Sequence, residues 1–133
     1  MDKIVLDSWA VIAWLNKEPG YKQIDQWLEK GRREEAVLLM SIINIGEVYL
    51  QIGRKRGKEM ARTIIEKLRQ IPIQVVRVSN ALVYKAFDYQ FSHDLPLADA
   101  FVLATADRED AQILTGDSHF KPFDRIIWVS EEN

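Results

Sequence analysis

Short apolar runs alternate with longer, helix-like segments from one end of the chain to the other. A short apolar run between turn residues is typical of a buried strand, whereas apolar positions three and four residues apart indicate a helix. The short runs predict strands at residues 3–6, 36–40, 73–77, 112–114 and 126–129. The longer segments predict helices near residues 8–15, 20–31, 42–55, 58–70, 80–91 and 97–109. This alternation predicts an α/β fold with a central parallel sheet.

The helix breakers fit one domain over residues 1–133. Pro19-Gly20 separates the first two predicted helices, Gly53 and Gly57 bracket a basic turn, and Pro72 precedes the third strand. The chain shows no repeat or linker and is long enough to form one core. No apolar run approaches the ~20 residues of a membrane span, and the first predicted strand begins at residue 3. We therefore expect no signal peptide, no membrane partner and a cytoplasmic location.

Asp99 is the most informative acid, because it is the only charge in the apolar run of residues 97–106. This run predicts a helix that is buried nearly all round. An ionised carboxylate inside such a helix must be paired, hydrogen-bonded or bound to a metal. The alternative is an acid that stabilises the first helical turn, with Pro96 at the first helical position.

Two further acids follow predicted strands. Asp7 comes directly after residues 3–6, and Asp117 lies in the turn after residues 112–114. Parallel α/β sheets bind ligands beyond the carboxyl ends of their strands, so both positions suit a functional site. Asp7 or Ser8 could equally cap the next helix, and Asp117 could be an ordinary turn residue.

Glu47 is the fourth candidate acid. Asn44, Glu47 and Gln51 share one face of the predicted helix, opposite a stripe of isoleucine, valine and tyrosine. This polar face could look at solvent or at a pocket that it shares with the other acids. On our map of the elements, all four acids converge on one edge of the sheet.

Composition narrows what such a cluster could hold. The chain has no cysteine and only two histidines, so a zinc centre lacks its usual ligands. Carboxylate oxygens favour Mg²⁺ or Mn²⁺. Four neighbouring carboxylates repel one another unless cations bind them, and two bound divalent ions can support hydrolysis of a phosphodiester. The net charge of −2 neither favours nor excludes a nucleic-acid partner.

The residues around the four acids resemble the acidic motifs of PIN-domain ribonucleases, and specifically of the small VapC-type toxins. The similar segments are IVLDS at residues 4–8, NIGEV at 44–48, LADA at 97–100 and LTGD at 114–117. The resemblance covers nearly the whole chain. It implies a PIN-like fold with about five parallel strands and helices on both faces, and metal-dependent cleavage of RNA with two ions. It also implies a cognate antitoxin and a homodimer.

The resemblance also assigns roles to residues by position. Asp7, Glu47 and Asp99 would be the main metal ligands, and Asp117 a fourth that acts directly or through water. Short polar side chains beside them could orient the carboxylates and metal-bound water, although each is also an ordinary cap or turn residue: Ser8, Asn44, Thr115 and Ser118. Trp9 departs from the family pattern, which has a smaller residue there. His119, two residues past Asp117, also departs from the pattern and could be a proton donor. We expect it instead to be a solvated loop residue, because two-metal sites do not need an imidazole.

Candidate RNA contacts come from basic residues after the Glu47 helix: Arg54, Lys55, Arg56 and Lys58. Arg32 and Arg33 end the second helix and are further candidates for phosphate contacts, although both groups could simply be solvated. The aromatic residues of the first two helices, Trp9, Trp14, Tyr21 and Trp27, could line a groove for an amphipathic antitoxin helix or pack in the core.

Other functions are less compatible with the chain. Asp7-Ser8-Trp9 lacks the second acid of a haloacid-dehalogenase-like phosphatase. A response regulator would need paired acids near the N-terminus, which this chain does not have. No glycine-rich turn for a dinucleotide follows the first strand. The main rival is a catalytically silent PIN-like scaffold that binds RNA or protein. The four acids favour the enzyme.

Overall fold

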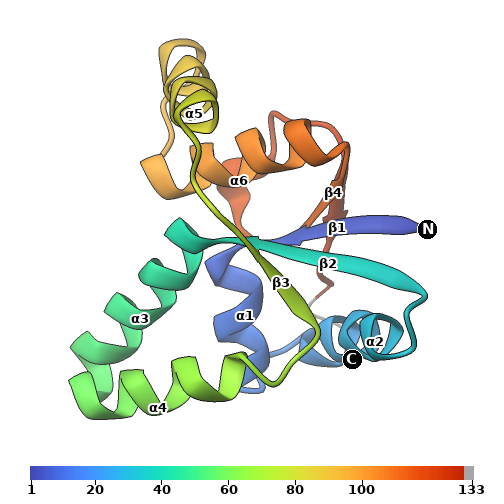
Figure 1. Ribbon diagram of the computed structural model, residues 1–133, viewed down its shortest axis with the longest axis vertical. Coiled ribbons are helices and arrows are strands. Elements are labelled where there is room, and N and C mark those ends of the chain that lie inside the picture. The colour runs from blue at the N-terminus through green and yellow to red at the C-terminus, as the bar shows by residue number, and fades with distance from the viewer. Residues whose placement is uncertain (131–133) are drawn as a thin grey trace.

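The computed structural model describes residues 1–130; the last three residues of the predicted domain, 131–133, lie outside the described residues. One parallel sheet has the strand order β3-β2-β1-β4-β5 (Figure 1). The strands are β1 (Asp2–Leu6), β2 (Ala36–Ser41), β3 (Ile73–Val76), β4 (Gln112–Thr115) and β5 (Ile126–Trp128). The α/β class and the five parallel strands that the sequence predicted are therefore confirmed.

Six α-helices and one short 3₁₀ helix connect the strands. They are α1 (Ser8–Leu15), α2 (Tyr21–Arg32), α3 (Ile42–Arg56), α4 (Lys58–Leu68), α5 (Asn80–Ser92), α6 (Leu97–Glu109) and η1 (Ser118–Phe120). The predicted helix at 58–70 was two residues too long, because residues 69–72 form the turn into β3. Pro96 is the residue before α6 and not its first helical residue. No described helix combines the length and apolar character that a membrane crossing requires.

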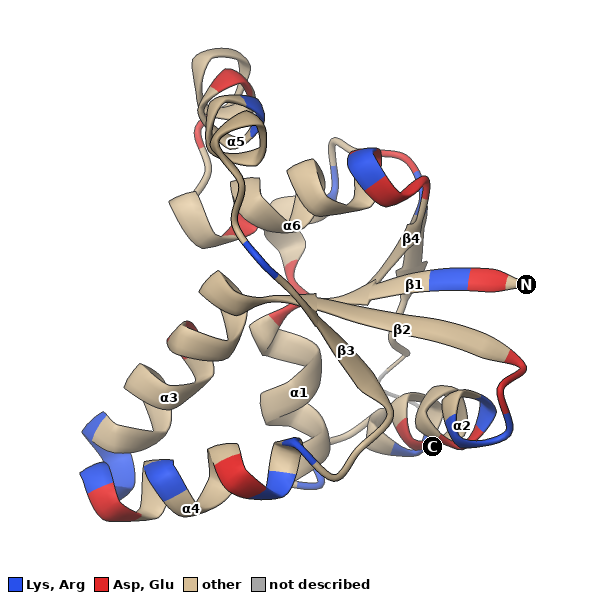
Figure 2. Ribbon diagram, in the orientation of Figure 1, with Lys and Arg blue, Asp and Glu red and all other residues tan. Residues whose placement is uncertain are grey.

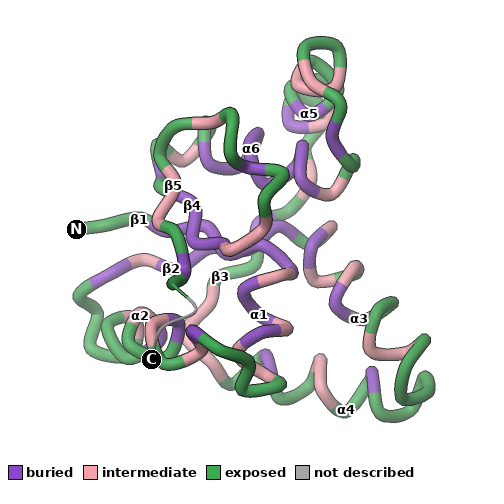
Figure 3. Tube along the Cα trace, turned by 180° about the vertical axis from the view of Figure 1, so that it is seen from behind, coloured by how far each residue is buried: buried purple, intermediate pink, exposed green. Residues whose placement is uncertain are grey.

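Helices cover both faces of the sheet because alternate strand residues point to opposite sides. Val5 packs with α5 and α6 on one face, whereas Ile4 and Leu6 pack with the first four helices on the other. The central strands β1 and β4 are buried on both faces and are accordingly apolar throughout their buried parts. Figure 3 shows that buried residues are concentrated in α6 and in the strands of the sheet.

The strand order creates a switch point beside β1. From β1 the chain proceeds outward to β2 and β3, and then α5 and α6 carry it back to β4 on the other side of β1. At such a point the connections leave neighbouring strands in opposite directions, so the carboxyl ends of the strands border an open crevice. Asp7 and Asp117 follow the two strands that meet there.

Candidate metal centre

All four candidate acids lie at this crevice. Glu47, Asp99 and Asp117 line a pocket of about 390 Å³ together with Ser8 and His119. Asp7 is buried next to the pocket, where the charges of Asp99 and Asp117 act on it. In Figure 2, acidic segments from several elements meet beside the start of α1. The sequence had separated these side chains by up to 110 positions, and the fold brings them together.

Asp7 has two roles in the geometry. Its Oδ1 atom accepts a hydrogen bond from the backbone N of Ala10 at 2.9 Å, so Asp7 is the N-cap of α1. Its Oδ2 atom accepts a hydrogen bond from Oγ1 of Thr115 at 2.6 Å. Burial nevertheless raises the pKa of Asp7 to about 7, against the lowering effect of these two bonds. The capping and site interpretations of Asp7 are therefore compatible.

Thr115 connects the acid after β1 with the acid after β4. While its hydroxyl donates to Asp7, the same Oγ1 atom accepts a hydrogen bond from the backbone N of Asp117 at 2.9 Å. Asp117 in turn caps η1 by accepting from the backbone N of His119 at 2.9 Å. Thr115 is fully buried, so it holds both acids in a fixed relation.

Asp99 lies on the first turn of α6, and its side chain is only 9% exposed. Its Oδ2 atom forms an ion pair with Nδ1 of His119 at 3.1 Å and has no other polar partner among the described residues. Burial raises the pKa of Asp99 to about 6, and the charges of Asp117 and Glu47 add to this effect while His119 opposes it. A buried carboxylate oxygen with a single half-exposed partner can accept a cation as well.

His119 bridges two of the acids. Its Nδ1 atom lies 3.0 Å from Oδ1 of Asp117 and 3.1 Å from Oδ2 of Asp99. The hydrogen bond with Asp117 is the main reason why the pKa of His119 is raised. The side chain is half exposed, as expected for a loop histidine, but it also lines the pocket beside Asp117.

α3 contributes Glu47 and is tied to the other elements by polar side chains. The hydroxyl of Ser8 donates a short hydrogen bond to Glu47. Nδ2 of Asn44 donates to the carbonyl O of Ala98 at 3.2 Å, next to Asp99 in sequence. Asn44 is fully buried, so this bond fixes the start of α3 against the start of α6.

The remaining predictions for single residues have mixed outcomes. Ser118 is exposed, and its hydroxyl makes no hydrogen bond with the described residues. Trp9 fits because Gly116 has no side chain: a Cβ atom at Gly116 would lie 2.3 Å from the indole ring. Glu18 also lines the pocket, and no sequence signal marked it, since it belongs to an ordinary loop between α1 and α2.

The donor set fits divalent cations. Within the described residues, ligand atoms of Asp99, Asp117 and His119 lie within 4.8 Å of one another. Oxygen ligands dominate the pocket, as Mg²⁺ and Mn²⁺ prefer. A bound cation would add a partner to the Oδ2 atom of Asp99, which among the described residues otherwise has only His119, and would relieve the mutual repulsion of the acids.

The candidate phosphate contacts lie at different distances from this pocket. Lys55 and Arg56 line a neighbouring hollow of about 160 Å³ between α1 and α3, and Ile12 and Gln51 line both this hollow and the acid pocket. A groove therefore runs from the acids toward Lys55 and Arg56. Arg54 and Lys58 are exposed beside its far end, where Figure 2 shows basic segments, but line neither hollow.

Arg32 and Arg33 are in the wrong place for phosphate contacts at the acids. They lie just before β2, hence at the amino ends of the strands and on the opposite edge of the sheet. Both form ion pairs with Glu29, at 3.2 and 3.3 Å. The interpretation of these two residues as solvated charges is the better one.

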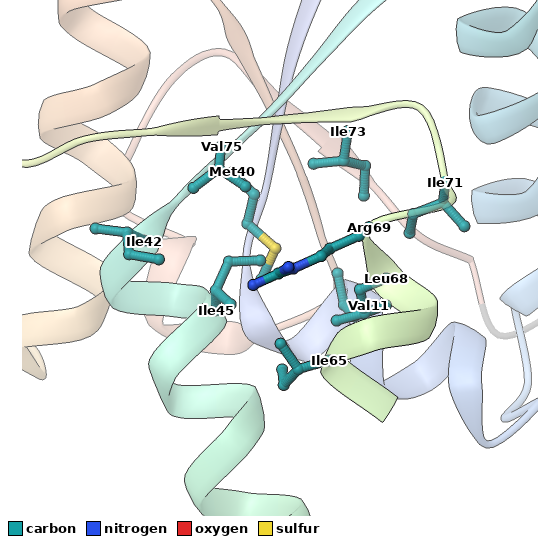
Figure 4. A pocket seen from close by; sticks show the side chains of 10 residues that line it. All are labelled: Val11, Met40, Ile42, Ile45, Ile65, Leu68, Arg69, Ile71, Ile73 and Val75. Carbon is teal, nitrogen blue, oxygen red and sulfur yellow. The ribbon is translucent and has the colours of Figure 1, made fainter. Parts of the chain in front are cut away.

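A second, apolar hollow lies away from the acids (Figure 4). It has a volume of about 270 Å³ and is bordered by β2, β3, α3, α4 and α1. Its lining consists of apolar residues except for Arg69, whose guanidinium extends across it. Trp9, Trp14, Tyr21 and Trp27, the expected groove aromatics, do not line this hollow; Trp14 instead donates to Asp25 at 3.0 Å and Trp27 packs under Lys30.

Comparison with known proteins agrees with this architecture. VapC20 of Mycobacterium tuberculosis, described as a toxin that cleaves the sarcin-ricin loop, superposes with a TM-score of 0.71 at 19% identity over 90% of this chain and 93% of that one. VapBC bound to DNA from Salmonella typhimurium gives a TM-score of 0.73 at 14% identity over 98% of this chain and 100% of that one.

A third neighbour, FitAcB of Neisseria gonorrhoeae, gives a TM-score of 0.65 at 20% identity over 94% of this chain and 96% of that one. At these identities the likeness shows the fold alone. No curated protein matches the chain. The sequence model of the PIN domain matches residues 4–126 and spans the strands that carry the acids, so this chain belongs to the PIN domain family.

Proposed function

We propose that this protein is a metal-dependent endoribonuclease and the toxin of a type II toxin–antitoxin pair. The observation that carries the proposal is the pocket at the switch point, which Glu47, Asp99 and Asp117 line with Asp7 buried beside it, so that burial and their charges raise the pKa of Asp7 and of Asp99. Mg²⁺ or Mn²⁺ would be the cofactor, with two ions during cleavage.

The proposed chemistry assigns distinct tasks to the chain's own residues. Asp7, Glu47, Asp99 and Asp117 would hold the ions, which when bound supply an activated water and stabilise the leaving oxygen of the phosphodiester. Thr115 and Ser8 orient Asp7 and Glu47 through their hydrogen bonds. Such bonds reduce the freedom of a carboxylate before the metal arrives and thereby favour binding.

RNA would approach along the groove between α1 and α3. Lys55 and Arg56 line its outer part, so a phosphate of the bound strand can contact cationic groups on one side while another lies at the carboxylates. Arg54 and Lys58 would strengthen the local positive potential without lining the groove. A PIN-like scaffold that binds RNA without cleaving it would use the same groove, and cleavage therefore decides between the two functions.

The direct test combines metal titration with RNA cleavage. We would titrate Mg²⁺ and Mn²⁺ into the wild type and into Asp99→Asn, and then incubate each protein with a mixed RNA pool. The matched control is Asp94→Asn, because Asp94 is an exposed acid just before α6 and lines no part of the pocket. The proposal expects binding and cleavage to be lost together in Asp99→Asn only. Unchanged cleavage in Asp99→Asn would refute the site, and binding without cleavage in the wild type would favour the scaffold.

We also propose a cognate antitoxin as partner, because one structural neighbour is a toxin–antitoxin complex from Klebsiella pneumoniae. An arginine or lysine of the antitoxin would enter the acid pocket and replace the charge of the metal. The apolar hollow of Figure 4 would accept an apolar side chain of the same partner. Asp7→Asn should then weaken both metal binding and the complex, and an unchanged affinity for the antitoxin would contradict this arrangement.

A homodimer is proposed on the exposed face of α5, which projects from the rest of the molecule (Figure 1). Tyr84, Phe87 and Phe91 repeat at helical spacing, and Tyr84 and Phe91 are 74% and 89% exposed. Aromatic side chains on one helix face are typical of an interface between subunits. Sedimentation equilibrium should give a dimer for the wild type and a monomer for Phe91→Ser.

A further inference from the structure

His119 is the one imidazole in the acid pocket, and its position is fixed by the backbone. η1 begins after Asp117, and the backbone N of His119 donates to Oδ1 of Asp117 at 2.9 Å. The next residue, Phe120, is fully buried and anchors this short helix in the core. The backbone of His119 is therefore held beside the pocket by the fold, and the contacts of Nδ1 with the two acids orient the imidazole.

The distances around Nδ1 of His119 match those between ligands of one ion. This atom lies 3.0 Å from Oδ1 of Asp117 and 3.1 Å from Oδ2 of Asp99. Ligand atoms about 2.1 Å from an octahedrally coordinated ion are about 3.0 Å apart when they occupy adjacent corners. All three ligand atoms also lie within 4.8 Å of one another, so a single ion could touch each of them.

Asp99 supplies an independent indication that a ligand is required at this position. Its side chain is 9% exposed, and its Oδ2 atom has no hydrogen-bond or ion-pair partner among the described residues other than Nδ1 of His119. A bound cation would satisfy this buried oxygen more fully than the half-exposed imidazole does alone. The exposed half of His119 leaves the same place open to an ion from solvent.

We propose that His119, Asp99 and Asp117 form one cation seat of the pocket, and that the imidazole ligand favours Mn²⁺ over Mg²⁺ there. Mg²⁺ binds oxygen ligands in proteins almost without exception, whereas first-row transition metals accept imidazole nitrogen readily. The other two candidate acids, Asp7 and Glu47, accept hydrogen bonds from Ala10, Thr115 and Ser8 and are not part of this seat. This inference rests on the proposed function, since it presumes that the pocket binds divalent ions.

The test is calorimetric titration of Mn²⁺ and of Mg²⁺ into the wild type, His119→Ala and His119→Asn, with no RNA present. Removal of the ligand should lower the affinity for Mn²⁺ by roughly tenfold or more and the affinity for Mg²⁺ much less. His119→Asn places an amide oxygen near the seat, so it should retain Mg²⁺ better than Mn²⁺. Pulsed electron paramagnetic resonance of bound Mn²⁺ should show coupling to a nitrogen nucleus in the wild type and not in His119→Ala.

The matched control is His93→Asn, which alters the only other histidine of the chain. His93 packs against Phe123, with ring centroids 4.5 Å apart, and does not line the acid pocket. This variant should keep the affinities and the nitrogen coupling of the wild type. Loss of both in His93→Asn would overturn the assignment of the nitrogen to His119.

Two results would overturn the inference, and they are distinguishable. If His119 only balances the negative charge of the acids, its removal will change the affinities for Mn²⁺ and Mg²⁺ by the same factor, and the carboxylate site will remain valid. If the wild type binds neither ion, the carboxylate site fails as well. Circular dichroism of each variant would verify that a lost affinity does not reflect a lost fold.

Discussion

The acid pocket and the apolar hollow are two cavities of one small domain, and they differ in their lining. The acid pocket gathers four carboxylates, two of them buried, and among the described residues His119 is the only cationic group paired with them. The apolar hollow between α3, α4 and the sheet is lined by isoleucine, leucine, valine and methionine, with Arg69 across it. The first cavity carries negative charge that is not fully compensated, whereas the second is an apolar space that side chains do not fill.

This difference indicates that the acid pocket contributes to ligand binding and the residues around the apolar hollow contribute to stability. Carboxylates buried near one another cost free energy while no cation binds them, so the acid pocket lowers the stability of the metal-free fold. Apolar side chains around a hollow already stabilise the fold, and an apolar partner would only add to that. Variants should therefore separate metal binding at one cavity from stability at the other.

The largest expected effect is on cleavage by Asp7→Asn. The amide keeps the N-cap of α1, since asparagine is also a good capping residue, but removes one charge from the metal site. RNA cleavage should fall by roughly a hundredfold or more, and metal affinity with it. Thermal unfolding of the metal-free protein should occur at an equal or higher temperature than in the wild type. A strongly destabilised but active variant would contradict the contrast between the two cavities.

Leu68→Ala probes the apolar hollow from α4. Leu68 is buried and lines the hollow, so its truncation enlarges the cavity and should lower the free energy of unfolding by about 2–4 kcal/mol. Urea denaturation measures this loss. Titration of Mn²⁺ into the folded variant should give the affinity of the wild type, because Leu68 does not contact the acids. A reduced metal affinity would show that the two regions are coupled.

The stability of the protein should depend on pH through the acid pocket and not through the apolar hollow. The pKa of Asp7 is raised from 3.8 to about 7, so the folded state binds a proton more tightly than the unfolded state. The stability that this proton provides is fully present below pH 3.8 and is lost as the pH rises through 7. Between pH 5 and pH 7 the metal-free protein should lose roughly 2 kcal/mol from this group.

Urea denaturation at several pH values in the presence of a chelator measures this loss. In Asp7→Asn the slope over the same range should be smaller, and in Leu68→Ala it should equal that of the wild type. Saturating Mn²⁺ should restore stability at high pH, because the ion competes with protons for the carboxylates. A slope of opposite sign would mean that Asp7 is stabilised as the anion without metal.

The smallest expected effect is on RNA affinity, when basic residues near each cavity are replaced. The double variant Lys55→Gln/Arg56→Gln removes two charges from the groove that leads to the acid pocket. Affinity for a single-stranded RNA should fall roughly tenfold at low salt, and its dependence on salt should weaken. Arg69→Gln removes one charge at the apolar hollow and should change neither. Metal affinity should be the same in all three proteins, and filter binding at several salt concentrations provides the comparison.

Part of the candidate site could be predicted from the chain because two of its acids have a local signature. Asp99 stands alone in an apolar helix, and Asp7 directly follows an apolar strand. Hydrophobic periodicity also placed every strand and α-helix, because the alternation between faces of a strand or helix is a local property. The errors occurred at the ends, as in the turn at residues 69–72, where local preferences compete with tertiary contacts.

His119 shows why other parts could not be predicted. An isolated histidine in a loop has no periodicity or spacing that reveals its neighbours, and its contact with Asp99 depends on how η1 follows β4. The same limit applies to Glu18 and to the choice of Lys55 and Arg56 from the basic residues. Arg32 and Arg33 were wrongly grouped with them, because the chain alone does not reveal which edge of the sheet a helix end occupies.

By itself, the sequence determined the helices and strands, their alternation and the predominance of oxygen among the possible ligands. It also showed that a single carboxylate, Asp99, stands in an apolar helix. These properties depend on residues that are near one another along the chain. Only the tertiary structure decided that β4 returns beside β1, and this order joins Asp7 to Thr115 across 108 positions. The distances between ligands, the groove to Lys55 and the apolar hollow all depend on this packing of distant segments, because a site is made of contacts through space.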